Sequence, residues 1–164
     1  MISKSHKTLL LRVGMDRGTG GALGPIFNDG TFEYMPTPER ERTREHGSYA
    51  TLPGRHGRPL AAYLPARLAN VHPHIDPEFK IATYGDAAPR KRRQLGKLTP
   101  EDILVFYCGL MPYPQTEAPR LFVIGYLYVK QVHVLTEREI RLSQGLRRPR
   151  NTAHFVRDPR ACRG

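Results

Sequence analysis

The sequence predicts an α+β domain with a mixed, mainly antiparallel, curled sheet and few short helices. Two apolar segments carry this prediction, residues 103–110 and 121–129. Both are short, rich in β-branched and aromatic residues, and bounded by proline, glycine and polar clusters, as buried strands are. A βαβ arrangement is disfavoured because no amphipathic helix separates the early strands. We therefore expect the core to form on these two segments, which the proline-rich residues 111–120 connect as a loop.

Shorter apolar runs predict the remaining strands. The dipeptide Asp29-Gly30, flanked by apolar and aromatic residues, is a strong hairpin signal. Residues 79–84 form a short apolar run that enters a turn at Gly85. The predicted strands cover residues 8–14, 25–28, 31–35, 79–84, 103–108 and 121–134.

Two helical segments are expected. Residues 59–70 can hold a short helix, limited by Pro65. Near the C-terminus, Thr136 has a glutamate three residues later, which is a capping-box pattern. It predicts a helix over residues 137–144, closed by Gly145.

Length and composition predict one cytoplasmic domain. The 164 residues suffice for a single domain, in which 39–58 is an exposed charged loop and 147–164 a basic tail. The abrupt basic end leads us to expect a C-terminally truncated domain. No apolar run is long enough to span a membrane. The two cysteines, Cys108 in a strand and Cys162 in the tail, do not form a disulfide framework.

The charge balance favours a polyanionic partner. The chain has 26 basic and 15 acidic residues, a formal net charge of +11, and most of the basic residues are arginine, which suits phosphate contacts. An arginine-rich proteome would give the same bias. Residues 89–97 hold five cations, and this cluster is interpreted either as a nucleic-acid contact or as a solvated linker. Four of its cations are adjacent: Arg90, Lys91, Arg92 and Arg93.

A glycine-rich loop follows the first predicted strand. Its glycines permit positive φ and close backbone approach, so the loop is either a tight structural turn or a phosphate contact. It is not a Walker A sequence, and it lacks the full dinucleotide-binding fingerprint. The loop comprises Asp16, Arg17, Gly18, Thr19, Gly20, Gly21, Ala22, Leu23 and Gly24.

Two histidines and two carboxylates occur close together in residues 71–79. His72, His74, Asp76 and Glu78 are of the types that ligate metals. Two prolines in the same stretch favour an extended structural or substrate-facing loop, and no distant ligand set accompanies it. We predict no metal site here, and the sequence leaves any cofactor unknown.

Several stretches together are similar to one known family. Residues 9–21, 24–39, 76–79, 83–86 and 102–110 resemble the nucleotide modification associated domain 3 family, which is linked mainly by genomic context to DNA base hypermodification. The resemblance covers residues 8 to about 157. It makes candidates of the polar positions within these motifs, which are Arg12, Asp16, Asp29, Glu39, Asp76, Tyr84, Asp86, Asn151 and His154.

A second resemblance concerns residues 99–129. This stretch is similar to PUA-like domains of the ASCH and EVE kind, which are small open barrels that bind RNA or modified bases. Those domains commonly carry Pro-Gly-Asp where this chain has Pro100-Glu101-Asp102. The resemblance implies that a PUA-like open barrel is an alternative form of the predicted sheet.

These observations support three functional hypotheses. The first is a domain serving base modification, with Asp16, Asp86 and His154 as catalytic groups and a base or nucleotide in a polar pocket. The second is a non-catalytic reader of modified DNA or RNA, and the third a structural subunit of a modification or restriction system. Expected partners are DNA or a nucleotide and modification enzymes. The predicted binding residues are Arg12, Arg17, Gly18, Gly20, Gly21, Tyr84, Arg90, Lys91, Arg92, Arg93 and Tyr107. The candidates for an aromatic wall against a flipped base are Tyr84, Phe106, Tyr107 and Tyr126.

Overall fold

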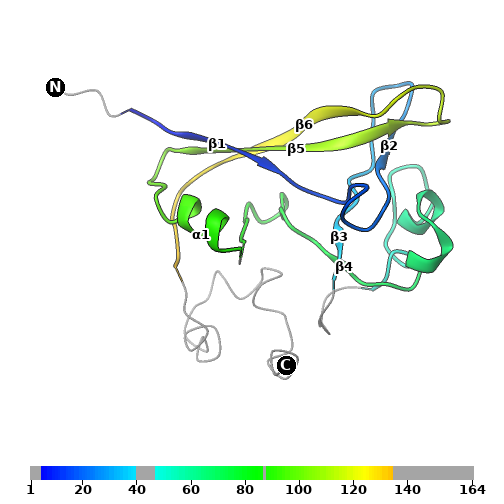
Figure 1. Ribbon diagram of the computed structural model, residues 1–164, viewed down its shortest axis with the longest axis horizontal. Helices are drawn as coiled ribbons and strands as arrows, with labels where there is room; N and C mark the ends of the chain where they lie inside the picture. Colours follow the sequence, from blue (N-terminus) through cyan, green and yellow to red (C-terminus); the bar gives the residue numbers. More distant parts are fainter. Residues whose placement is uncertain (1–4, 40–46, 87, 135–164) are drawn as a thin grey trace, which may run out of the picture.

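The computed structural model describes residues 5–39, 47–86 and 88–134. Its elements alternate short strands with few short helices (Figure 1). In chain order they are β1 (Thr8–Arg12), β2 (Gly24–Ile26), β3 (Thr37–Pro38), the 3-10 helices η1 (Leu60–Tyr63) and η2 (Ala66–Leu68), β4 (Pro73–His74), the α-helix α1 (Pro89–Leu95), β5 (Ile103–Pro112) and β6 (Arg120–Tyr128). None of the helices within these residues has the length and apolar character needed to cross a membrane.

The long strand β5 organises the main sheet. Along one edge it pairs antiparallel with β6, and along the other it pairs parallel first with β1 and then with β2. The predicted mixed sheet is confirmed, and it is not closed into a barrel. Antiparallel pairing holds for β5–β6 and for the separate pair β3–β4, but not for β1 and β2. Parallel pairing needs a long crossover connection, and the many residues between β2 and β5 provide one.

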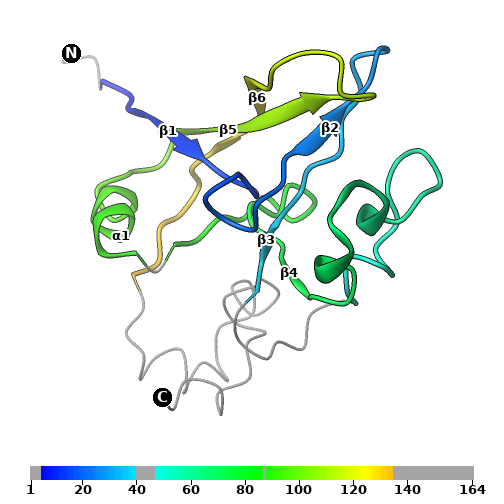
Figure 2. The ribbon, with the colours of Figure 1, turned by 45° about the vertical axis from the view of Figure 1, so that its right-hand side comes forward.

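One face of this sheet covers the core. Leu11, Leu104 and Phe106 point to that face and are buried. Helix α1 lies below the sheet on the same side in both ribbon views (Figures 1 and 2), and the half-buried Leu95 at its end packs against this cluster. A second cluster forms beside η1 and η2, around the buried Met15 and Tyr49. The sheet therefore has one packed face.

The predicted hairpin turn is present, but its second arm is short. The backbone N–H of Phe27 donates to the carbonyl of Thr31 (2.8 Å), and Gly30 has φ of +79°, as three-residue hairpin loops with an αL glycine require. Beyond the turn only one isolated bridge, Ile26 to Phe32, extends the pairing. The predicted strand 31–35 was wrong, because its backbone leaves the ladder after Glu33.

The predicted strand 79–84 was also wrong. Residues 79–82 form a turn closed by the bridge between Glu78 and Thr83, and Ala82 lies at φ of +53°. The turn places the Phe79 ring over β6, where a methyl group at Gly125 would come within 2.6 Å of it. This apolar run therefore packs a side chain against the sheet and does not form one of its strands.

The structure differs from the predicted helices. Residues 59–70 were expected to hold one short helix, and they instead form two 3-10 turns on either side of Pro65. The basic cluster is not a linker but the helix α1, with Pro89 at its first turn and Gly96 at its end. The helix predicted over 137–144 lies outside the described residues.

The turn before β5 holds a non-glycine residue at positive φ. The N–H of Asp102 donates to the carbonyl of Thr99 (3.1 Å), and Glu101 has φ of +78°. This is a type II turn with Pro100 at its second position and Glu101 at the position that favours glycine. Asp102 itself is buried, and its carboxylate accepts from the backbone N–H groups of Lys7 (2.8 Å) and Thr99 (2.7 Å). These two hydrogen bonds lower its pKa.

Replacing Glu101 with glycine is expected to stabilise the protein by about 0.5–1 kcal/mol, because relief of the left-handed conformation exceeds the entropic cost of glycine. Denaturant unfolding measures this change. The matched control is Glu101→Ala, which removes the same side chain but keeps Cβ and should give no gain. Equal stabilisation by alanine would contradict the backbone explanation.

Candidate functional site

A polar cavity of about 500 Å³ lies beside the edge of the sheet formed by β1. Its walls come from the end of β1, the glycine-rich loop, β3, β4, the segment before α1, and α1 itself. The volume falls within the usual range for small-molecule sites. The lining residues are Arg12, Val13, Gly14, Asp16, Thr19, Thr37, His74, Asp76, Tyr84, Gly85, Asp86, Ala88 and Lys91.

An arginine–aspartate pair forms one wall. The Arg12 guanidinium lies 3.2 Å from an Asp16 carboxylate oxygen, and the arginine side chain is 51% exposed. The other Asp16 oxygen accepts from the backbone N–H of Thr19 (2.7 Å). Arg12 is thus oriented by Asp16 while its remaining N–H groups face solvent, where an anion can approach them.

The glycine-rich loop is closed on itself. The backbone N–H groups of Thr19 and Gly21 both donate to the carbonyl of Asp16 (3.2 and 2.9 Å), so these two donors are occupied within the loop. Gly20 has φ of +88° and packs against Met15. Of the two interpretations of this loop, these contacts support the structural turn, which positions the Asp16 side chain.

An aspartate–lysine pair forms a second wall. The Asp86 carboxylate accepts from Lys91 Nζ (2.9 Å), from the Tyr84 hydroxyl (3.2 Å) and from the backbone N–H of Ala88 (2.8 Å). Burial, aided by the charge of Asp86, raises the pKa of Tyr84 well above its usual range. Tyr84 is therefore a neutral donor, and Asp86 fixes both Tyr84 and the ammonium group of Lys91.

Two further polar residues of the lining, His74 and Asp76, are held in place by neighbouring groups. His74 Nδ1 lies 3.1 Å from a carboxylate oxygen of Glu39, whose side chain is almost fully buried. The Asp76 carboxylate accepts from the backbone N–H of Gly85 (3.3 Å), and its carbonyl accepts from the buried hydroxyl of Tyr34 (2.6 Å). Within the described residues, no group of three or more His, Cys, Asp or Glu is placed to hold a metal ion.

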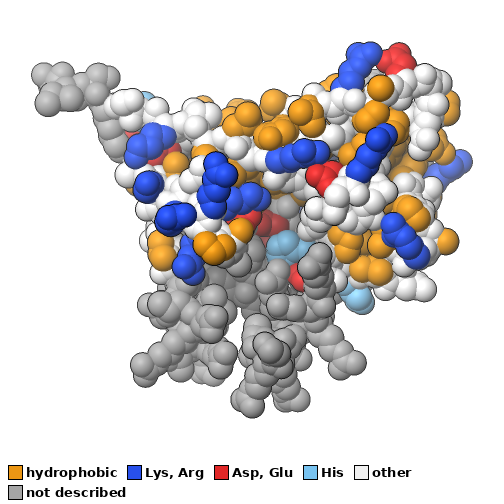
Figure 3. Space-filling model, in the orientation of Figure 1, with side chains coloured by type: hydrophobic (Ala, Val, Ile, Leu, Met, Phe, Trp, Pro, Cys, Tyr) orange, Lys and Arg blue, Asp and Glu red, His pale blue; other side chains and the backbone are white. Residues whose placement is uncertain are grey.

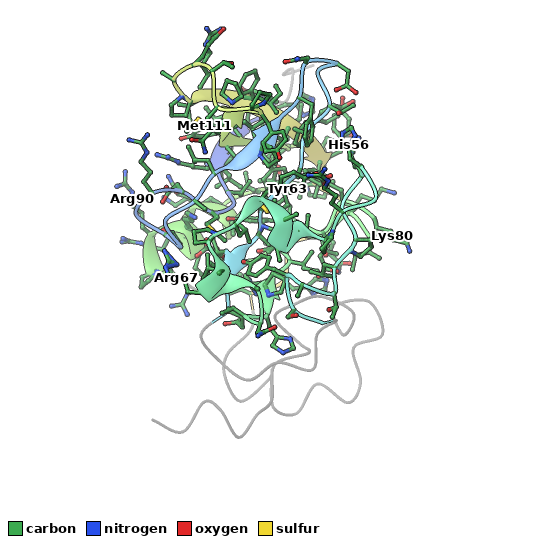
Figure 4. The ribbon with its side chains drawn as sticks, turned by 90° about the vertical axis from the view of Figure 1, so that its right-hand side faces the viewer. His56, Tyr63, Arg67, Lys80, Arg90 and Met111 are labelled. Carbon is green, nitrogen blue, oxygen red and sulfur yellow. The ribbon has the colours of Figure 1, made fainter. Side chains whose placement is uncertain are left out.

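A second cavity of about 420 Å³ lies on the other side of the glycine-rich loop. Arg17 and Gly21 line it, together with Tyr63 of η1 and Met111 of β5, which Figure 4 labels. The Arg67 side chain of η2 donates to the carbonyl of Gly20 (3.2 Å). Arg17, within the loop, and Arg12, at the end of β1, therefore line different cavities.

The structure brings together five of the residues predicted for the site. These are Arg12, Asp16, Tyr84, Asp86 and Lys91. Sequence reasoning missed Thr37, because β3 has only two residues and shows no periodicity. Thr19 lies in the glycine-rich loop but was not singled out. The remaining predicted residues lie elsewhere: Gly18 and Gly20 in the loop, Arg90, Arg92 and Arg93 on α1, and Tyr107 on β5.

Three other residues that the sequence analysis discussed do not line the cavity. Phe106 was considered as an aromatic wall, but it is completely buried in the core. Asp29 stays in the hairpin turn, where its carboxylate accepts from Thr31, and these hydrogen bonds lower its pKa. Cys108 is a buried free thiol whose pKa is raised by burial to about 11. Asn151, His154 and Cys162 lie outside the described residues.

The fold and the cavity define a small α+β protein with a polar pocket walled by cation–carboxylate pairs. The sequence profile of the family described as nucleotide modification associated domain 3 matches residues 7–162, nearly the whole chain. The chain belongs to this family. Searches of curated proteins and of solved structures give no match.

Proposed function

We propose that this domain acts in DNA base modification by binding a base or nucleotide in the polar cavity. The observation that carries the proposal is the convergence of Arg12, Asp16, Tyr84, Asp86 and Lys91 on one cavity. They come from three separate segments of a chain whose family is associated with nucleotide modification. A cavity on which polar and charged side chains converge is where a ligand site is expected.

The two walls together offer both cations and carboxylates to a nucleotide. Arg12 and Lys91 supply cations for a phosphate, while Asp16 can accept from the N–H or O–H groups of a base or sugar. Asp86 already accepts three hydrogen bonds, so it is the positioning residue for Lys91 and Tyr84. Asp16 is then the better placed of the two for proton transfer, if the site is catalytic.

A non-catalytic reader would use the same cavity. It would bind a modified base without converting it, and a modification enzyme would act as its partner. Turnover distinguishes the two: incubation with nucleotide or DNA and mass spectrometry of the products would show a mass change only for an enzyme. Asp16→Asn should abolish that change in an enzyme while leaving binding of a phosphate measurable.

Arg12→Gln is expected to weaken binding of a deoxynucleoside monophosphate about 10- to 100-fold, the usual cost of a hydrogen bond to a charged group. Lys91→Gln should act in the same direction. Calorimetric titration of the nucleotide, and of the corresponding nucleoside, measures both changes. The loss should be confined to the phosphorylated ligand, because Arg12 and Lys91 are assigned to the phosphate.

Two variants serve as matched controls. Arg17→Gln removes an arginine from the same loop region but from the other cavity, and Arg90→Gln removes one from the same helix as Lys91. Both should leave mononucleotide affinity unchanged. If Arg17→Gln weakened binding and Arg12→Gln did not, the site would lie in the second cavity and the proposal would fail.

A further inference from the structure

The second face of the main sheet carries a continuous apolar surface. Large side chains here are more than half exposed, including Leu10 (59%), Val123 (66%) and Tyr126 (59%). Single exposed apolar residues are ordinary, but contiguous ones mark interaction surfaces. Figure 3 shows hydrophobic side chains gathered along the top of the molecule, over the sheet. The outer-face residues of β6 are Leu121, Val123, Tyr126 and Tyr128, all exposed.

Strand register joins these residues into rows across the sheet. Tyr126 is paired with Val105, which is paired with Leu10 on the next strand. One row further along, Val123 is paired with Tyr107, and Tyr107 with Arg12. The rings of Tyr126 and Tyr128 are 5.7 Å apart and meet edge to face. The surface therefore presents three tyrosines within a continuous apolar area.

The strands that form this surface carry no acidic side chain. Their only charged residues are Arg12 and Arg120. Arg120 is paired with Glu117 in the β5–β6 loop (2.6 Å) and is 69% exposed. Figure 3 shows further Lys and Arg side chains below the sheet, around α1. A second copy of this chain, with the same formal charge of +11, would meet this face against electrostatic repulsion.

We infer that the outer face of the sheet formed by β1, β5 and β6 binds single-stranded nucleic acid by base stacking. Tyrosine rings stack on unpaired bases of any sequence, and positively charged borders follow the phosphates. The tyrosines of this surface supply the stacking platform, and the net charge of +11 favours a polyanionic partner. Its chemistry is common to single-stranded DNA and RNA.

The inference goes beyond the proposed function, because it concerns an oligonucleotide on the sheet and does not require an occupied cavity. The two regions are nevertheless adjacent. Arg12 stands in register with Tyr107 on the sheet, and the same residue lines the cavity. An oligonucleotide bound on the sheet would thus pass over the edge at β1, where one of its bases can enter the cavity.

The test is binding of a labelled oligothymidylate and a matched oligouridylate to the full chain and to the double variant Tyr126→Leu/Tyr128→Leu. Leucine keeps an apolar surface but removes the aromatic faces. Fluorescence anisotropy should show a loss of about tenfold or more, as expected when stacked bases lose their aromatic partners. Tyr113→Leu is the control, since Tyr113 is 40% exposed but lines the second cavity.

Three readouts decide the inference. Loss of oligonucleotide binding with mononucleotide binding unchanged supports it, and separates it from the cavity proposal. A preference between the two oligonucleotides would name DNA or RNA as the natural source while supporting the same surface. Unchanged oligonucleotide affinity in the leucine variant would overturn the inference. So would sedimentation of the wild type as a dimer that Val123→Asp splits, because the face would then belong to a second copy.

Discussion

Phe106→Ala is expected to lower the free energy of unfolding by about 3–5 kcal/mol, the usual cost of removing a buried phenylalanine. The Phe106 side chain is fully buried, and its ring lies 5.6 Å from that of Phe79 and 5.1 Å from that of Tyr84. Alanine would leave a cavity at the centre of the sheet that β5 and β6 cannot close. Because Tyr84 also lines the polar cavity, nucleotide affinity should fall as well.

Urea unfolding followed by circular dichroism measures the loss through the midpoint concentration. Tyr126→Ala is the control on the same sheet; its side chain is exposed, and the change should stay within about 0.5 kcal/mol. Phe106→Leu keeps most of the volume and should cost less than alanine. A cost below that of Tyr126→Ala would show that the core is not packed around Phe106.

Gly20→Ala is expected to cost about 2–4 kcal/mol. Its φ of +88° disfavours any side chain by roughly 1–2 kcal/mol. In addition, a methyl group would lie 2.5 Å from Met15 Cγ and 2.6 Å from its sulfur, and such overpacking typically costs about 1–3 kcal/mol. The loop that holds Asp16 would shift, so nucleotide affinity should fall together with stability.

Gly30→Ala separates the two contributions. Gly30 has a similar φ of +79°, but nothing lies within 4 Å of the position that a methyl group would take. Its cost should therefore be that of the backbone alone, and the difference between the two variants measures packing against Met15. Equal costs in thermal unfolding would show that Met15 moves aside freely.

The sequence was most informative where hydrophobicity was continuous. The segments of β5 and β6 were found because an unbroken apolar run has few alternatives to a buried strand. An unbroken apolar run does not show which of its residues face inward. Phe106 was therefore considered for the site, although it is buried. Helix α1 was missed because four of its seven residues are cationic and none is buried, which leaves no apolar stripe to detect.

The candidate site was predictable where polar residues border turns, as Asp16 and Asp86 do. It was not predictable where residues arrive on two-residue strands, as Thr37 does on β3. Nor did local patterns give the parallel pairing of β1 with β5, because periodicity identifies a strand without naming its neighbour. The separation of Arg12 and Arg17 into two cavities depends on that pairing and on the closed loop after β1.

The position of β5 has a consequence for synthesis of the chain. Residues of β1 and β2 leave the ribosome before those of β5, yet their ladder partners in the main sheet lie within Ile103–Pro112. The contact between Thr8 and Ile103 spans most of the described chain, and such non-local pairing is slow to form. β5 and β6, in contrast, are joined by a short loop and can pair as soon as both have emerged. The later strands β5 and β6 are thus the template with which the earlier strands β1 and β2 pair.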